Sequence, residues 1–420
     1  MKVVVWMATA ALLTATPGDA EILSQRDVIV TALRDNPRLK AARATWEIMK
    51  ARVPQARAWE DPRGGADFRV ERSVDIPPNS FMDQTFMLEQ EIPVSGKNLS
   101  RGRAATAEAF AAFEDLRRAE LDVVMKARSD YARWANAYSQ LEVNRRNSDL
   151  IGQFVQISRS RYEAGTATQP DVLTAQTDAA KLLEMRADIE RQISEAESAL
   201  NVLMNRSAQA PLGRPGKLVM HEATLSLQRL QSIALAQRPE LQRAQRRVEA
   251  EKARLQLANR QWFADPAVNV KAQRYNDASQ AVSEVDVGVS FPIPWANWKK
   301  YSAAMVEARK SVETAEREFE AARAETLGLV RDQLNKVQTS AAQYRIYNTE
   351  VLPVARQTVE ASRSAYEAST GGFLELVTAR RTLQDAESAT LNHLTNYETA
   401  LAELDALVGR ETLTAKGGKE

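Results

Sequence analysis

Few residues in the 420-residue chain have the types and spacing that chemistry would need. There are two histidines, His221 and His393, and neither has a carboxylate or a second histidine at ligand spacing, so we expect structural roles for both. Cysteine is absent, which excludes disulfides, thiolate ligands and a cysteine nucleophile. The sequence contains no glycine-rich phosphate loop and no nucleophile elbow. It therefore predicts no enzyme, no bound cofactor and no metal centre.

The charge of the chain also limits the class of partner. There are 56 Lys and Arg residues against 55 Asp and Glu, so the net charge is close to zero. A nucleic-acid-binding protein needs a basic surplus to displace counterions from phosphates, and we expect no nucleic-acid partner here. Charges of both signs alternate along the helical stretches, as in 186–191, which predicts ordinary solvent-exposed helix faces.

Charged side chains do gather in four segments in which apolar and polar residues alternate. Residues 81–92 and 281–293 are the longer two, and 67–71 and 268–273 are the shorter two. A two-residue period predicts strands with one apolar and one polar face, as in a water-soluble sheet or a membrane barrel with a water-filled lumen. We favour the barrel because the longer strands have the length of a tilted transmembrane strand. The predicted lumen residues are Asp67, Arg69, Glu71, Asp83, Glu89, Asn269, Lys271, Glu284 and Asp286.

Residues 1–20 have the features of an export signal. Lys2 is followed by an apolar run over 3–13, and 18–20 end in small residues suited to cleavage. A buried N-terminal helix is the alternative. The run is too short to cross a bilayer as a helix, and no later stretch approaches the necessary length. Four strands cannot close a barrel, so we expect several subunits to pool their strands.

The mature chain repeats itself at a spacing of about 200 residues, which indicates two copies of one assembly. Each copy has the predicted order helix, two strands, long helix, turn, long helix. The first helix of each copy, at 24–58 and 225–261, should break at Asn36-Pro37 and at Arg238-Pro239. Three stretches of the first copy recur in the second: 32–39 recurs as 234–241, Asp61-Pro62 recurs as Asp265-Pro266, and Ile92-Pro93 recurs as Phe291-Pro292.

The repeat gives a division of the chain. We predict a signal peptide at 1–20, the first repeat at 21–206, a linker at 207–224, the second repeat at 225–410 and a disordered tail at 411–420. No proline occurs from 94 to 169 or from 295 to 352, so the helices after the strands should be very long. Their apolar residues recur at coiled-coil spacing. The fold class is mainly α with a small β part.

A signal segment, two copies of a strand pair with a long helical hairpin, and a Tyr-Glu-Ala-Gly turn together resemble the TolC family of outer-membrane efflux proteins. The resemblance covers nearly all of 21–410, and its most specific element is 161–165 followed by 171–176. It implies a homotrimer with a twelve-stranded transmembrane β-barrel and an α-barrel tunnel in the periplasm. It also implies a periplasmic adaptor protein, an inner-membrane pump that is proton-driven, and contact with outer-membrane lipid.

The resemblance further assigns residues to the two turns. The periplasmic gate would include Asp171, Tyr366, Glu375 and Thr378, with a hydrogen bond from Tyr366 to Asp171. Thr378 stands where a second carboxylate is common, which implies a less acidic mouth. Alternatively, Asp171 and Glu375 cap the helices that follow the turns. The adaptor-contact residues would be Arg161, Tyr162, Gly165, Gly371 and Gly372.

The predicted function is that of an outer-membrane channel subunit of a tripartite efflux system, exporting small toxic solutes or heavy-metal cations. Residues 90–97 resemble the strand-to-helix junction of the heavy-metal branch. One alternative is an outer-membrane duct for type I protein secretion. The other is a soluble periplasmic coiled-coil adaptor or scaffold, which would have no use for strands with an apolar face opposite a charged one.

Overall fold

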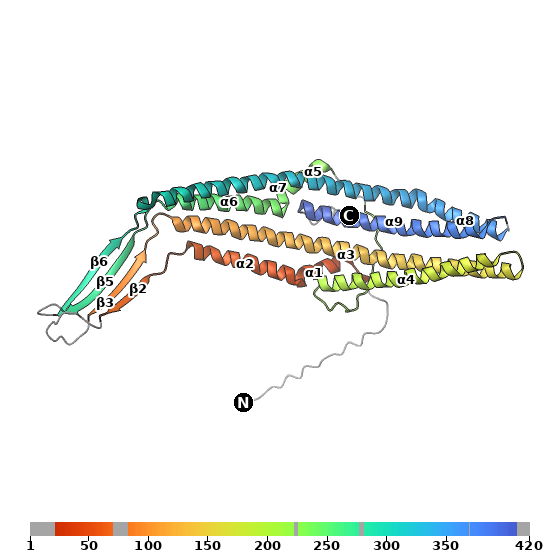
Figure 1. Ribbon diagram of the computed structural model, residues 1–420, viewed down its shortest axis with the longest axis horizontal. Coiled ribbons are helices and arrows are strands. Elements are labelled where there is room, and N and C mark those ends of the chain that lie inside the picture. Colours follow the sequence, from red (N-terminus) through yellow and green to blue (C-terminus); the bar gives the residue numbers. More distant parts are fainter. Residues whose placement is uncertain (1–21, 70–82, 222–225, 277–280, 369, 410–420) are drawn as a thin grey trace, which may run out of the picture. The chain divides into compact units, whose positions relative to one another are not determined.

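The computed structural model describes residues 22–69, 83–221, 226–276, 281–368 and 370–409 (Figure 1). The predicted signal at 1–20, the predicted tail at 411–420 and Glu71 lie outside these residues. Within the described part of the chain, no helix has a stretch long and apolar enough to cross a membrane. The elements follow the predicted order in each copy.

The first helix of each copy is broken at its proline, as predicted. In the first copy α1 (Gln25–Asp35) is followed by α2 (Pro37–Arg57), and in the second α5 (Leu227–Gln237) is followed by α6 (Pro239–Arg260). Asn36 ends the first break by accepting a hydrogen bond from the backbone N–H of Arg38 at 2.9 Å. The proline then occupies the first helical position, where its missing N–H costs nothing.

The long helices are α3 (Lys97–Glu163), α4 (Gln169–Leu203), α7 (Trp298–Ile346), α8 (Leu352–Glu367) and α9 (Phe373–Val408). Helix α3 alone has 67 residues, about 100 Å at 1.5 Å per residue. A π-helical turn at Tyr347–Val351 separates α7 from α8. This π-helical turn was not predicted from the sequence. It precedes Pro353, whose ring and missing N–H disturb the regular helical bonding pattern.

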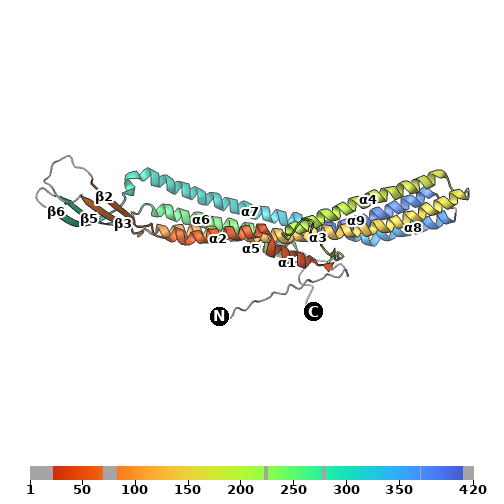
Figure 2. The same ribbon diagram turned by 90° about the horizontal axis from the view of Figure 1, so that it is seen from below.

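By internal contacts the chain forms two compact units, and each takes residues from both copies. Of the described residues, those in 22–31, 127–219 and 347–395 belong to the first unit, and those in 32–126, 220–346 and 396–409 belong to the second. In the first unit α4, α8 and parts of α3 and α9 lie side by side (Figure 1 and Figure 2). They bury an apolar core that includes Phe154, Leu182, Tyr366, Phe373 and Leu376.

The predicted linker contains an element that sequence analysis did not predict. Residues Arg214–Pro215 form β4, which pairs in parallel with β1 at Ile22–Leu23. Tyr131 of α3 holds this small sheet, because its hydroxyl donates to the Leu23 carbonyl at 2.9 Å and accepts from the Gly216 N–H at 2.9 Å. The linker is therefore anchored to the first unit.

The second unit contains an antiparallel four-stranded sheet in the order β2 (Arg63–Phe68), β3 (Gln84–Glu91), β5 (Ala267–Asn276), β6 (Ala281–Ser290). Its register pairs Glu89 with Asn269 and Lys271 with Asp286. Directly paired residues share a face, so the predicted polar side chains of these strands lie on one face. Those within the strands are Asp67, Glu89, Asn269, Lys271, Glu284 and Asp286.

The opposite face of the sheet is apolar and uncovered. Val285 and Val287 are 70% and 72% exposed, and Phe86 is 50% exposed. Phe68 packs edge-on against Phe86 with ring centroids 5.9 Å apart. The predicted alternation is therefore confirmed, and the chain leaves a continuous apolar surface on one side of the sheet. Beyond β2, Arg69 forms an ion pair with Asp83 at 3.2 Å.

The junction between β3 and α3 is closed by a buried carboxylate of the second copy. Asp265, 2% exposed, accepts hydrogen bonds from the Ser95 N–H at 2.7 Å and the Ser95 hydroxyl at 2.8 Å. It also pairs with the Lys97 ammonium at 2.9 Å. Gly96 between them has φ +71, a conformation that favours glycine. The Ser-Gly-Lys segment thus joins the two copies beside the sheet.

Candidate functional site

The predicted gate residues lie around two turns of the first unit, one between α3 and α4 and the other between α8 and α9. Gly165, just after the end of α3, has φ +72, as its place after a helix predicted. At the second turn, a Cβ added to Gly371 would lie 3.0 Å from the Ala365 Cβ. A side chain at Gly371 would therefore crowd the last turn of α8.

Asp171 acts as a cap of α4. Its carboxylate accepts a hydrogen bond from the Thr168 N–H at 3.0 Å, as part of a capping box. The predicted bond from Tyr366 to Asp171 is not formed. The Tyr366 side chain is buried, and among the described residues its hydroxyl has no hydrogen-bond partner. The capping alternative therefore describes Asp171 in this structure.

The two turns are joined instead by Arg161, for which sequence analysis predicted adaptor contact. The Arg161 guanidinium lies over the Tyr366 ring, 4.6 Å from its centroid. Its Nη1 also donates a hydrogen bond to the Tyr366 carbonyl. A cation over an aromatic face is attracted by the ring quadrupole, more so when water is excluded. Arg161 thus connects the end of α3 to the end of α8.

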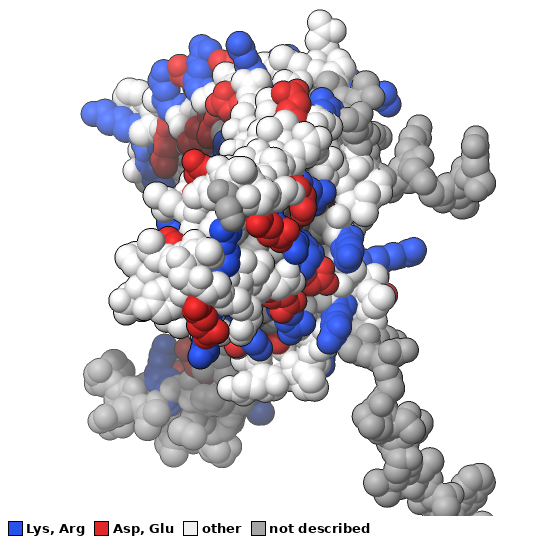
Figure 3. Space-filling view, turned by 90° about the vertical axis from the view of Figure 1, so that its right-hand side faces the viewer, with Lys and Arg blue, Asp and Glu red and all other residues white. Residues whose placement is uncertain are grey.

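Glu375 and Thr378 both lie on the exposed side of the first turns of α9. The Thr378 hydroxyl donates to the Leu374 carbonyl of its own helix at 2.7 Å. Tyr162 at the first turn is 48% exposed. Figure 3 views this end of the first unit, where basic and acidic side chains are interspersed. Glu375 is therefore free to face solvent or another subunit.

A buried ion cluster near the turns was missed by sequence analysis. Asp178 of α4 is 1% exposed and Arg380 of α9 is 2% exposed. They pair at 3.0 Å, and Arg381 also pairs with Asp178. Arg380 further donates to Gln384 at 2.8 Å. The available signal was the position of Asp178 on the buried stripe of α4, between Ala175 and Leu182 at helical spacing.

The electrostatics of this cluster favour the ionised carboxylate. Burial acts to raise the pKa of Asp178, but the hydrogen bonds and charges of Arg381 and Arg380 outweigh it and hold the pKa below its ordinary value. Burial lowers the pKa of the Arg380 guanidinium, but the ordinary pKa of arginine is so high that both arginines stay protonated at physiological pH. At physiological pH the cluster is therefore an ionic contact between α4 and α9, the helices that follow the two turns.

Comparisons with known proteins agree with this architecture. The family described as outer membrane efflux protein matches residues 28–206 and 230–410. The alkaline protease secretion protein AprF of Pseudomonas aeruginosa is 24% identical over 439 residues, covering 97% of this chain and 89% of AprF. The cobalt-zinc-cadmium resistance protein CzcC of Cupriavidus metallidurans is 23% identical over 388 residues, covering 90% of this chain and 88% of CzcC.

A solved structure gives the same fold. The outer membrane protein VceC from Vibrio cholerae matches with a TM-score of 0.77 and 18% sequence identity, covering 92% of this chain and 96% of VceC. The predicted resemblance to outer-membrane efflux proteins is confirmed by the family match over 28–206 and 230–410. The predicted fold, long helical hairpins with a small β part, is confirmed as well.

Proposed function

Because the chain belongs to the outer membrane efflux protein family and is an outer-membrane efflux channel, we propose that it is the exit duct of a tripartite system. The observation that carries this proposal is the family match over both repeats. The sheet supports it, because a charged face opposite an uncovered apolar face suits a wall between water and lipid. The channel itself has no catalytic activity in this proposal.

Three subunits would complete the duct. Strands β2 and β6 are the two edges of the four-stranded sheet, and within the described residues neither has a neighbour on its outer side. Edge strands pair readily with another chain. Closing three such sheets into one barrel places the apolar faces against outer-membrane lipid. The residues on the lumen side would be Asp67, Arg69, Asp83, Glu89, Asn269, Lys271, Glu284 and Asp286, with Glu71 outside the described residues.

The turns of the first unit would meet a periplasmic adaptor protein, and an inner-membrane, proton-driven pump would supply the energy. Tyr162 supports this part, because it presents a half-exposed aromatic ring at the turn. Gly165, Gly371 and Gly372 keep the turns free of bulky side chains. Arg161 would act as a positioning residue: its contacts with Tyr366 would fix the two turns relative to each other, more than it would contact the adaptor itself.

We propose heavy-metal cations or small toxic solutes as cargo, because of the likeness to CzcC and the 90–97 junction. The second candidate is a duct for protein secretion, favoured by the likeness to AprF. The test is a complementation experiment in two bacterial strains. The protein is expressed in a strain that lacks the outer-membrane channel of a metal-efflux system, and in a strain that lacks the outer-membrane channel of a protease-secretion system. Restored growth on cobalt, zinc or cadmium supports efflux. Restored secretion without metal resistance overturns the efflux assignment.

Glu375→Ala is expected to lower the preference of the channel for cations. Three copies of this exposed carboxylate around a threefold axis would attract cations at a narrow mouth. The measurement is the reversal potential of single channels in a salt gradient across a planar bilayer. Glu367→Ala, which removes another exposed carboxylate near the same turn, is the control. An unchanged reversal potential in Glu375→Ala would remove Glu375 from the mouth.

Tyr366→Phe is expected to leave the resting conductance as in the wild type, because the tyrosine hydroxyl makes no hydrogen bond with the described residues. Arg161→Ala removes both the stacking contact and the bond to the Tyr366 carbonyl, and should increase the time spent in open states. Single-channel recording of both variants checks the difference. Opening in Tyr366→Phe alone would show that the hydroxyl holds the gate in the assembled protein.

A further inference from the structure

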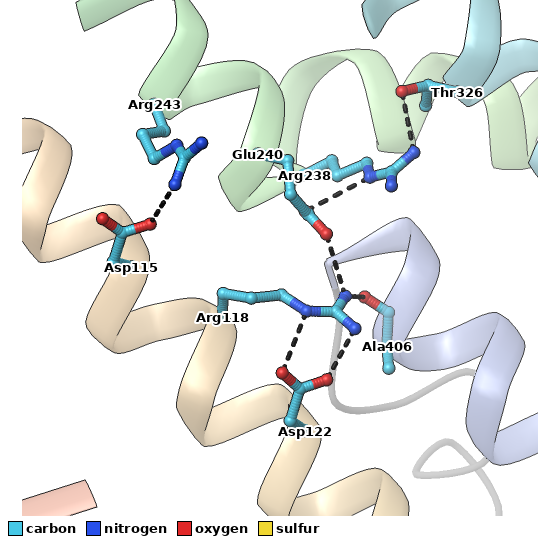
Figure 4. Close-up of polar contacts among 8 residues, drawn as sticks. All are labelled: Asp115, Arg118, Asp122, Arg238, Glu240, Arg243, Thr326 and Ala406. Atoms are coloured by element: carbon cyan, nitrogen blue, oxygen red, sulfur yellow. Dashed lines mark hydrogen bonds and ion pairs between the residues drawn. The ribbon is translucent and has the colours of Figure 1, made fainter. Parts of the chain in front are cut away.

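The two copies meet inside the second unit through α3 of the first copy and α6 of the second. Arg254 of α6 forms an ion pair with Glu108 of α3, and Arg243 pairs with Asp115 at 3.0 Å. Further along, Arg118 of α3 pairs with Glu240 at the start of α6 (Figure 4). The contact thus contains three ion pairs that follow one another along α3 and α6.

Small apolar residues lie among these charges. Ala250 is one helical turn before Arg254 and is 2% exposed. Ala107, 6% exposed, lies beside Glu108. Ala107 is also one helical turn before Phe110. The Arg246 guanidinium of α6 lies over the Phe110 ring, 5.0 Å from the ring centroid. Residues one turn apart share a helix face. At Glu108 and Arg254, the α3–α6 contact therefore combines a cross-copy ion pair with two buried alanines beside it.

The internal repeat gives each partner of this contact a counterpart. Helix α7 repeats α3, aligned by Pro93 and Pro292, and Glu307 then stands where Glu108 stands. Helix α2 repeats α6, aligned by Pro239 and Pro37, and Arg52 then stands where Arg254 stands. Both charges of this pair are kept in identity as well as in position, whereas the other two pairs are not kept: their counterparts are Thr314 with Ala41, and Arg317 with Arg38. The counterparts of Ala107 and Ala250 are Val306 and Ile48.

These counterparts are uncovered in the chain. Val306 is 56% exposed and Ile48 is 54% exposed, whereas the alanines they replace are buried. Glu307 has no ion pair among the described residues, and the Arg52 guanidinium reaches only the Met49 sulfur at 3.5 Å. A second surface of the α3–α6 type is therefore present as two separate halves, one on α2 and the other on α7.

We infer that α2 of one subunit packs against α7 of the partner subunit as α6 contacts α3 within the chain. Arg52 then pairs with Glu307 of the partner subunit, and Ile48 and Val306 are buried beside that pair. The inference rests on the proposed homotrimer and deepens it. The occupant is a second copy of this chain, because the charges of Arg52 and Glu307 are opposite, Ile48 and Val306 beside them are exposed, and the repeat supplies the geometry of the contact.

The larger side chains fit this assignment. Two subunits that associate lose translational and rotational freedom, a cost that helices within one chain do not have. Ile and Val in place of two alanines bury more apolar area and offset part of that cost. A contact between different surfaces of the same chain generates a closed ring when its rotation is one third of a turn, as a trimer requires. The outer strands β2 and β6 belong to the same copies as α2 and α7, respectively, so sheet and helices would close together.

The test uses the absence of native cysteine. The Arg52→Cys/Glu307→Cys variant, in native outer membranes, is treated with a short bismaleimide and run heated on a denaturing gel. The expected products are covalent dimers and trimers. Glu108→Cys/Arg254→Cys is the matched control, since the same crosslink there stays within one chain and leaves a monomer band. Arg52→Cys/Glu320→Cys places the second cysteine farther along α7 and should give no dimer.

The outcomes separate this inference from the proposed function. A trimer on an unheated gel without crosslinking between positions 52 and 307 overturns the α2–α7 contact and leaves the channel standing. A wild-type protein that is monomeric in the membrane overturns both. Charge reversal provides a second readout. Arg52→Glu and Glu307→Arg should each lower the temperature at which the trimer dissociates, and the double variant should restore it; a double variant no better than either single one counts against the pair.

Discussion

Asp178→Ala is expected to destabilise the first unit by about 3–5 kcal/mol, the usual loss when one partner of a buried ion pair is removed. The substitution leaves the Arg380 guanidinium, 2% exposed, without its anion. Arg381 reaches the same carboxylate and loses its partner as well. The measurement is denaturant unfolding of the purified protein in detergent, followed by its helical circular dichroism.

Asp188→Ala is the matched control for this prediction. Asp188 lies on the same helix, α4, and pairs with Arg191 of that helix, but it is exposed. Exposed pairs of this kind are screened by solvent, so the control should unfold close to the wild type. Equal losses in Asp178→Ala and Asp188→Ala would show that the buried cluster does not hold α4 to α9.

The same cluster predicts a pH dependence. The pKa of Asp178 is lowered in the folded protein, so its contribution to stability is complete above the unfolded pKa, near 4. That contribution is lost as the pH falls through the lower folded pKa. The difference in unfolding free energy between the wild type and Asp178→Asn should therefore be largest at neutral pH and shrink below about pH 4. If the difference in unfolding free energy between the wild type and Asp178→Asn stayed constant from neutral pH to below about pH 4, the lowered pKa of Asp178 would be contradicted.

Asp265→Ala is expected to cost about 3 kcal/mol and to reduce assembly in the outer membrane, because a buried, multiply bonded carboxylate is removed. Ser95 loses the acceptor of its N–H and its hydroxyl, and Lys97 loses its ion pair. All three groups lie where β3 leads into α3. The measurement is the fraction of protein that runs as an intact assembly on an unheated denaturing gel.

Glu60→Ala serves as the control for Asp265→Ala. Glu60 is close in sequence to β2 and forms an ion pair with Arg101 at 3.1 Å, but both side chains are exposed. Its removal should change stability by less than about 1 kcal/mol. If Asp265→Ala assembled as well as Glu60→Ala, the Ser-Gly-Lys junction would not depend on this carboxylate.

Much of the fold followed from local signals in the sequence. The strands were predictable because apolar residues of 281–293 alternate with Glu284 and Asp286, and the register places the charged ones on one face. The helix breaks were predictable because Pro37 and Pro239 constrain the residues before them. The positive φ of Gly165 was predictable because it depends on a single residue, a glycine directly after a helix.

The contacts of the site depended on tertiary structure and were mostly not predictable. Asp178 and Arg380 lie on different helices, and only the packing of α4 against α9 brings them together. Arg161 and Tyr366 belong to different copies, and sequence analysis assigned them to an adaptor contact and to a bond with Asp171. The packing instead places the guanidinium on the ring. Asp171 satisfies the Thr168 N–H at the start of α4, a local interaction that needs no partner helix.

The most direct test of the channel is made on the full chain expressed with its N-terminal segment. The cell envelope is fractionated, the purified protein is run unheated on a denaturing gel, and the same material is reconstituted in planar bilayers. The account predicts a trimer from the outer membrane that conducts ions. A soluble periplasmic protein without conductance would contradict it, and the four strands would then form an ordinary sheet in an adaptor or scaffold.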